Sequence, residues 1–157
     1  MKFQKLNVRR SSIGILAGVG LLLGLMGAPA ATQSGTIESA NLTPVAGTAG
    51  GRFSLENRDR RGNFCLGYVD NPDAPNHTMV LDRSFDRLTI QVNSRGGNTT
   101  LLVLGPTRDP LLRCNDSRDP SPDARIEDTD WAAGEYKIWV GSKDPNVTYE
   151  YTISLER

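Results

Sequence analysis

The residues best suited to chemistry lie in one acidic segment, residues 114–130, which reads CNDSRDPSPDARIEDTD. Five aspartates and one glutamate fall in this segment, and carboxylate oxygens are ligands that calcium prefers. An EF-hand counted from Asp116 would require glycine at its sixth position, where the chain has Ser121. The sequence therefore excludes an EF-hand and leaves two interpretations of the segment.

The first interpretation is a looser calcium site, which is the one cofactor that the sequence suggests. Its tentative ligands are aspartates of the segment: Asp116, Asp119, Asp123, Asp128 and Asp130. The second interpretation is a solvated turn between two strands, in which Arg118 and Arg125 partly neutralise the acidic groups.

Asp128 also bears on where a strand ends. Period-two alternation would place Ile126 and Asp128 on the inner face of one strand, where an unpaired carboxylate is costly. We expect this strand to end by Glu127, because the three residues from Asp128 onward have turn composition. Capping of Asp128 by backbone amides is the alternative.

Nucleophilic catalysis finds little support in the sequence. A serine nucleophile needs a base, and His77 is the only histidine of the chain. It precedes a predicted strand in DAPNHTMV, where we expect an exposed loop residue, and no G-x-S-x-G elbow occurs. We predict that the chain has no catalytic residues and is not an enzyme, with a small hydrolase as a distant alternative.

A binding surface is suggested by GEYKIWVG, residues 134–141. Alternation places Glu135, Lys137 and Trp139 together on the outer face of a strand whose inner face is apolar. A tryptophan in line with charged residues suits a sugar ring or an apolar patch on a partner. The alternative is that a neighbouring loop or the N-terminal segment covers Trp139.

Residues 1–30 have the layout of a bacterial secretory signal peptide. Four basic residues precede an apolar stretch at 13–27, and small residues follow at Ala28 and Ala30. The apolar stretch is shorter than the about 20 residues of a membrane span, so we expect cleavage after Ala30 rather than an anchor. Export by this route predicts a secreted or periplasmic protein; a twin-arginine signal is the alternative type of leader.

The charge balance bears on the class of partner. Four of the 18 basic residues and none of the 18 acidic residues lie in residues 1–30, which leaves 14 basic against 18 acidic and a net charge of −4. Nucleic-acid backbones are bound by clustered lysine and arginine. We therefore expect no nucleic-acid partner, and no stable membrane span in the mature chain.

Cys65 and Cys114 are the two cysteines of the chain. In the compartments reached by export, disulfides form and persist, so we expect these two residues to form one disulfide. A zinc site is disfavoured, because a single histidine cannot complete the usual ligand set.

The remaining sequence reads as short strands separated by turn residues. RLTIQVNS and TYEYTISLE alternate apolar and polar residues, TTLLVLGP is a continuous apolar run, and no stretch of ten residues or more has a helical period. About eight short strands predict an all-β protein, an antiparallel β-sandwich that is jelly-roll-like. We expect a flexible N-terminal segment over residues 31–43 and the sandwich domain over residues 44–157.

The C-terminal half contains four ordered motifs. They are T-x-L-x-L at 100–104, an Asn-Asp turn at 115–116, G-x-Y-x-[IV]-x-V-G at 134–141 and Y-x-[LI]-x-[LI] at 151–155. This frame, over about residues 85–157, resembles the bacterial pre-peptidase C-terminal (PPC) domain family.

The resemblance implies a β-sandwich that usually accompanies secreted proteases as an extra module. Some relatives bind collagen or polysaccharide, and some carry calcium at acidic turns. Where many members have Asn-Asp-Asp-Gly, this chain has Asn-Asp-Ser-Arg at 115–118, which loses a carboxylate and adds a cation. We expect a stand-alone secreted member of this family.

These observations together predict a non-catalytic exported binding or accessory module. Its partner would be a polysaccharide such as a cell-envelope glycan, or an extracellular protein. The alternative is a calcium-stabilised structural protein of the envelope, in which the acidic segment serves folding alone.

Overall fold

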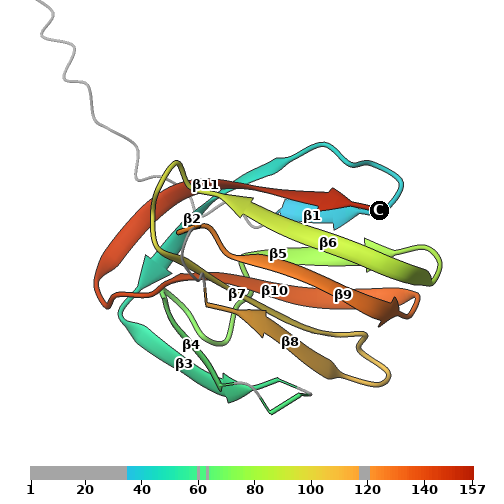
Figure 1. Ribbon diagram of the computed structural model, residues 1–157, viewed down its shortest axis with the longest axis horizontal. Coiled ribbons are helices and arrows are strands. Elements are labelled where there is room, and N and C mark those ends of the chain that lie inside the picture. Colours follow the sequence, from blue (N-terminus) through green and yellow to red (C-terminus); the bar gives the residue numbers. More distant parts are fainter. Residues whose placement is uncertain (1–34, 60, 63, 117–120) are drawn as a thin grey trace, which may run out of the picture.

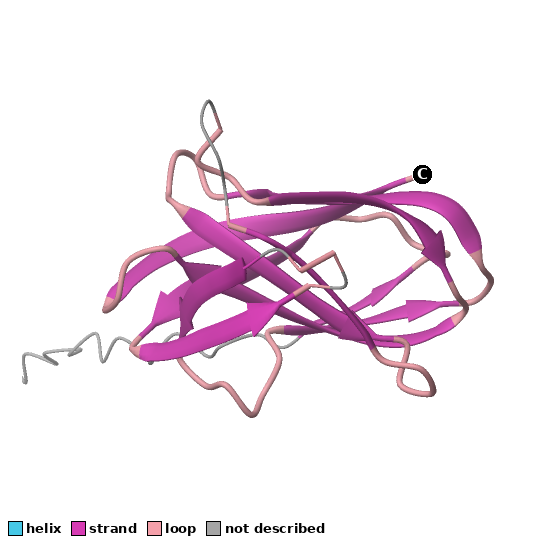
Figure 2. Cartoon of the chain, turned by 60° about the horizontal axis from the view of Figure 1, so that its bottom comes forward, coloured by secondary structure: helices cyan, strands magenta, loops and turns pink. Residues whose placement is uncertain are grey.

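The computed structural model of the protein describes residues 35–157, apart from residues 60, 63 and 117–120. In these residues the chain forms eleven strands and no helix (Figures 1 and 2). The strands are β1 (Gly35–Glu38), β2 (Val45–Gly51), β3 (Phe53–Arg58), β4 (Phe64–Val69), β5 (His77–Leu81), β6 (Phe85–Asn93), β7 (Thr99–Gly105), β8 (Leu111–Asn115), β9 (Arg125–Trp131), β10 (Gly134–Ser142) and β11 (Val147–Glu156). The described part of the chain thus holds no helix that could cross a membrane, and the predicted leader, residues 1–30, lies outside it.

The strands form two sheets that pack face to face. In the first sheet β1 pairs with β5, β5 with β10, β10 with β7 and β7 with β8, while β4 joins β10 beyond the end of β5 and carries β3 on its far side. The second sheet has the order β2-β11-β6-β9. This arrangement confirms the predicted all-β antiparallel sandwich, with one exception, since β1 and β5 run parallel.

The number of strands is higher than the predicted eight, and the three additional strands are β1, β2 and β3. Residues 31–43 were expected to be flexible, yet β1 forms within them and pairs with β5 over four residues. Ile37 supplies the one apolar side chain that β1 buries in the core. β2 consists mostly of small residues, so its sequence shows almost no alternation of apolar and polar side chains. It forms a strand because its backbone pairs with β11.

The core lies between the inner faces of the two sheets. Tyr136, Ile138 and Val140 of β10 are fully buried, as the alternation of that strand predicted. The second sheet contributes alternating residues of β6 and β11, which face β10 across the sandwich. The largest fully buried side chains are Trp131, Tyr136, Met79, Leu88, Ile90, Leu101, Ile138, Ile153, His77, Val92, Val103 and Val140.

The chain crosses from the second sheet to the first at Gly50 and Gly51. Their φ angles are 94° and 154°, a region that residues with a side chain rarely adopt. A Cβ at Gly51 would also collide with the backbone at Val69 and Asp70. This close approach sets the position of the hairpin that β3 and β4 form, which Figure 1 shows running from the end of β2 to a tip at the lower edge of the molecule.

The β3–β4 hairpin covers part of the outer face of the first sheet. On that face Trp139 of β10, Leu102 of β7 and Cys114 of β8 stand side by side in the strand register. Cys114 is joined to Cys65 of β4, with the two Cα atoms 6.0 Å apart. The expected cysteine pair is therefore at disulfide distance, and it attaches the hairpin to the sheet beside it.

Candidate functional site

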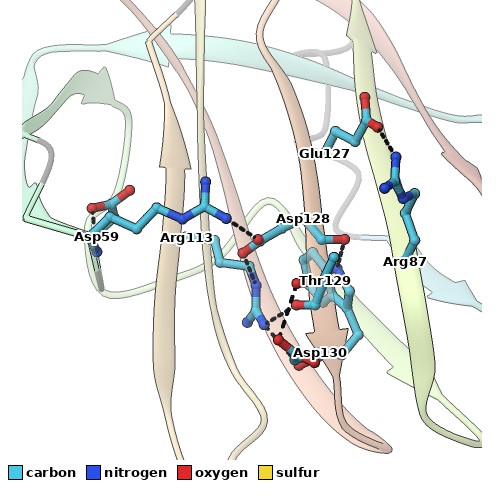
Figure 3. Close-up of polar contacts among 9 residues, drawn as sticks. Asp59, Arg87, Arg113, Glu127, Asp128, Thr129 and Asp130 are labelled. Atoms are coloured by element: carbon cyan, nitrogen blue, oxygen red, sulfur yellow. Dashed lines mark hydrogen bonds and ion pairs between the residues drawn. The ribbon is translucent and has the colours of Figure 1, made fainter.

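The polar site of the molecule forms where β8 and β9, the edge strands of the two sheets, face each other. Arg113 points inward from β8, because its register partner Val103 belongs to the core face of β7. Asp128 points inward from β9 and is in register with buried Leu88 of β6. The two charged side chains therefore lie on facing sides of the same interior (Figure 3).

Arg113 and Asp128 form a buried ion pair. Arg113 Nε donates to Asp128 Oδ2 at 2.9 Å, and the side chains are only 3% and 7% exposed. Arg113 Nη2 also donates to the backbone carbonyls of Thr129 at 3.3 Å and Asp130 at 3.1 Å. Its guanidinium carbon lies 4.0 Å from the centroid of the Trp131 ring, a cation–π geometry.

This pairing corrects the predicted end of the strand. β9 does not stop at Glu127 but continues to Trp131, and the guanidinium of Arg113 neutralises the inward Asp128. At Asp130 the backbone takes a φ of 60°, which reverses the alternation and turns Trp131 inward. Trp131 Nε1 then donates to the Asp128 carbonyl at 3.0 Å, so one buried cluster closes this end of the core.

A second arginine reaches Asp128 from the opposite side. Arg61, in the loop between β3 and β4, donates from Nη2 to Asp128 Oδ1 at 2.6 Å, and its side chain is 60% exposed. The Arg61 amide donates to Asp59 Oδ1 at 2.9 Å, which holds the loop in a turn. Asp128 thus links the interior of the sandwich to the tip of the β3–β4 hairpin.

Above this ion pair lies an open hollow of about 240 Å³. Its walls come from the hairpin loop, β8 and β9, and they carry charges of both signs together with Phe64, which is 50% exposed. The charged lining residues are Asp59, Arg61, Arg113, Asp116, Arg125, Glu127 and Asp128. Such a surface suits a polar or zwitterionic partner better than an apolar small molecule.

The tentative calcium ligands do not converge in the described residues. Asp116 lines the hollow, whereas Asp123 accepts hydrogen bonds from the amide of Ser94, at 2.8 Å, and from its hydroxyl. Asp130 accepts from the hydroxyl of Thr129 at 3.1 Å, and Asp119 lies outside the described residues. Within the part of the chain that the structure describes, no group of three or more histidine, cysteine, aspartate or glutamate side chains could hold a metal ion.

The proposed binding row on β10 is divided by the hairpin. Glu135 and Lys137 are exposed, but Trp139 is only 8% exposed and lines a narrow gap with Leu55 and Gly67 of the hairpin. It therefore offers no open platform in this structure. Among the described residues, the segment that covers it is the β3–β4 hairpin, where the alternative had named a neighbouring loop or the N-terminal segment.

His77 is not the exposed loop residue that we expected. It begins β5, is fully buried, and its Nε2 lies 2.6 Å from the hydroxyl of Tyr151 on β11. Its Nδ1 lies 3.3 Å from both the amide nitrogen and the carbonyl oxygen of Gly35. Burial lowers the pKa of His77 and raises the pKa of Tyr151, so a neutral pair joins the two sheets.

Arg113, Arg61 and Phe64 are residues of the site that the sequence did not indicate. A signal for Arg113 existed: PLLRC is a short apolar strand with one arginine, and Asp128 fell on an inner face in the alternation of its own strand. An arginine and an aspartate that both face the interior can neutralise each other. For Arg61 there was no local signal, because only the fold of the hairpin brings its loop to Asp128.

Comparison with known proteins yields one similar solved structure to report. It is a crystal structure of the pre-peptidase C-terminal domain of collagenase from Bacillus anthracis, with a TM-score of 0.47 and 12% sequence identity, covering 79% of this chain and 95% of that one. No family model and no curated protein sequence matches the chain. Similarity of this degree assigns neither a family nor a function to the chain.

Proposed function

We propose that this protein is an exported, non-catalytic accessory module that binds another secreted or envelope protein through the hollow between the β3–β4 loop, β8 and β9. The observation that carries the proposal is the composition of this hollow. It combines an exposed aromatic side chain, Phe64, with the guanidinium groups of Arg61 and Arg125. Aromatic and arginine side chains are the residues that most often dominate protein–protein binding energy.

The buried ion pair supports this role by ordering the site. Asp128 holds Arg61 at one wall, and Arg113 holds Asp128 in place from the interior. Preorganised charged groups lose less conformational entropy when a partner binds. A polypeptide is favoured over a glycan as the partner, because the tryptophan that suited a sugar ring is covered.

Export is part of the proposal, and two features support it. Residues 1–30 have the layout of a secretory leader, and the chain joins Cys65 to Cys114. Disulfides persist in secreted and periplasmic proteins and are rare in the cytosol. The absence of catalysis is supported by the position of His77, whose imidazole lies in the core against Tyr151 and cannot serve as a base for an exposed nucleophile.

The test is retention of partners on the immobilised protein. Envelope and culture-supernatant fractions of the producing cell would be passed over the wild type and over a variant with Phe64→Ser and Arg125→Glu. We expect the variant to retain at least about tenfold less protein than the wild type does. Its melting temperature should equal that of the wild type. Glu150→Lys, an exposed change on β11 in the other sheet, is the matched control and should retain the partner.

Two treatments separate the kinds of partner. Protease treatment of the fraction should abolish retention, and glycosidase treatment should leave it intact. Loss of retention on glycosidase treatment, or equal retention by the wild type and the hollow variant, would contradict the proposal.

A further inference from the structure

The hollow between the β3–β4 loop, β8 and β9 is bordered by the edge of β9 and not by one of its faces. Residues 125–128 line it, and they are consecutive in β9. Side chains of a strand alternate between its two faces, so consecutive residues line one hollow where the edge of the strand borders it. Figure 3 shows this alternation, with Glu127 directed towards Arg87 and Asp128 towards Arg113. Backbone groups of β9 therefore reach the hollow.

One side of β9 is paired with β6. The carbonyl of Ala124, just before β9, accepts from the amide of Val92 in β6 at 3.0 Å. In an antiparallel pair, hydrogen-bonded residues alternate along the strand, and the N–H and C=O of one residue point to the same side. The residues of β9 that continue this ladder are therefore Ile126 and Asp128, in register with β6. The residues between them direct their backbone groups away from β6.

The other side of β9 is met by side chains of β8 at two points. The amide of Arg125 donates to Asn115 Oδ1 at 3.3 Å, and the carbonyl of Thr129 accepts from Arg113 Nη2 at 3.3 Å. Glu127 lies between these two residues, so its N–H and C=O point the same way, towards the hollow. Among the described residues, these two groups have no hydrogen-bond partner. The edge of β9 is thus open at its centre.

We infer that the partner binds this open edge as an added β-strand. The inference rests on the proposed function, because it concerns the same hollow. An extended segment of the partner runs antiparallel to β9, and its residue opposite Glu127 exchanges both backbone hydrogen bonds with Glu127. The next bonds are made to the carbonyl of Arg125 and the amide of Thr129. A polypeptide backbone presents N–H and C=O groups at the repeat that this edge requires.

The charges on β9 define which segment fits. Arg125 and Glu127 are exposed on the outer face of the second sheet, and their side chains form an ion pair of 3.2 Å. Residues directly opposite in a sheet favour opposite charges. In an antiparallel strand, a basic residue therefore lies opposite Glu127, and an acidic residue two positions later lies opposite Arg125. The residue between them faces the hollow, where Phe64 and Leu112 provide apolar contacts. The segment has the pattern basic, apolar, acidic.

Hydrogen exchange with a blocked peptide of this pattern, TVKVEVT, tests the inference. At saturating peptide, we expect the amide of Glu127 to exchange at least about tenfold more slowly. The amides of Ile126 and Asp128 are already bonded to β6 and should change by less than about twofold. The same peptide methylated on the backbone nitrogen of its lysine cannot donate to Glu127 and should give no protection. No protection by TVKVEVT, or equal protection by the methylated peptide, would overturn the inference.

A proline variant tests the same edge from the side of the protein. Glu127→Pro removes an N–H that the ladder with β6 does not use, so the variant should melt cooperatively and yet fail to bind TVKVEVT. Glu127→Gln keeps this N–H and loses only a surface charge, so it should bind the peptide within about fivefold of the wild type. Normal binding by Glu127→Pro would sink the inference. Equal loss in the two variants would mean that the side chain is recognised and would also sink it.

Partner retention distinguishes failure of this inference from failure of the proposed function. Glu127→Pro should lose the retained protein as fully as the variant with Phe64→Ser and Arg125→Glu does. Loss in that double variant together with retention by Glu127→Pro would overturn strand addition and leave the proposed function standing. Retention by both variants would contradict the proposed function itself.

Discussion

Arg113 Nε lies 2.9 Å from Asp128 Oδ2, and the pair joins β8 and β9, the edge strands of opposite sheets. These edges have no backbone ladder between them, so side chains must hold this side of the sandwich together. An apolar contact would suffice for stability, whereas a charged pair also orders Arg61 at the surface. The same carboxylate therefore links the interior to the hollow.

Neutralising Asp128 should be strongly destabilising. Asp128→Asn leaves the buried guanidinium of Arg113 without its counter-charge, and breaking such a pair costs about 3–5 kcal/mol of unfolding free energy. Urea unfolding of the variant measures the loss. Glu127→Gln, the neighbouring exposed carboxylate on β9, is the control and should cost less than about 1 kcal/mol. Similar losses for the two variants would show that the ion pair contributes little.

Trp139 should behave as a packed residue. Trp139→Ala removes a large side chain from between the hairpin and the sheet and should lower the unfolding free energy by about 3–5 kcal/mol. Lys137→Ala, on the same strand and exposed, should change it by no more than about 0.5 kcal/mol. Normal stability of Trp139→Ala together with lost partner retention would instead favour an open binding platform.

Stability should fall as the pH drops below the ordinary pKa of histidine, 6.5. Burial lowers the pKa of His77 in the folded state, so between 6.5 and that lower value the unfolded chain binds a proton that the folded chain does not. The unfolding free energy then decreases with falling pH by at most about 1.4 kcal/mol per pH unit. Denaturant titrations between neutral and mildly acidic pH test this, and His77→Gln should show a smaller slope than the wild type. Equal slopes would mean that other groups cause the acid sensitivity.

Calcium should leave the melting temperature unchanged. The carboxylates of Asp123 and Asp128 already accept hydrogen bonds from Ser94 and from two arginines, so binding an ion would require breaking these contacts. A ligand that does not bind the folded state cannot stabilise it. Thermal melts in excess calcium and in chelator measure the effect. A midpoint that rises with calcium concentration would restore the calcium-stabilised alternative.

Local alternation accounts for most of what the sequence revealed about the fold. The eight strands from β4 to β11 were predicted because their side chains alternate or form short apolar runs between turn residues. β1 (GTIE) and β2 (VAGTAGG) were not predicted because short stretches of small residues carry little pattern, and β3 (FSLENR) alternates apolar and polar residues over only its first four positions. Such strands form because a neighbour supplies hydrogen bonds, and the neighbour of β2 is β11, about 100 positions away in the sequence.

The candidate site was less predictable than the fold. Asp128 was recognised as an anomaly on an inner face, but its partner is 15 residues away on another strand. The alternation of β10 correctly placed Trp139 on the outer face of its sheet, yet the side chain is covered. Alternation predicts the direction in which a side chain points and not which segment packs on it. The sequence next to His77 indicated a loop. Its partner Tyr151 is 74 positions away, so nothing local showed that the histidine is buried.

By itself, the sequence determined that this chain is built of short strands, that its two cysteines were candidates for one bond, and which side chains of the clearly alternating strands β6, β10 and β11 face the core. Alternation and turn composition are local properties, and a reader needs only neighbouring residues to see them. The tertiary structure alone decided that Asp128 meets Arg113, that a hairpin covers Trp139 and that the single histidine is buried. These are contacts between segments distant in sequence, and they exist because two sheets close on one another and bring unrelated strands within hydrogen-bonding distance.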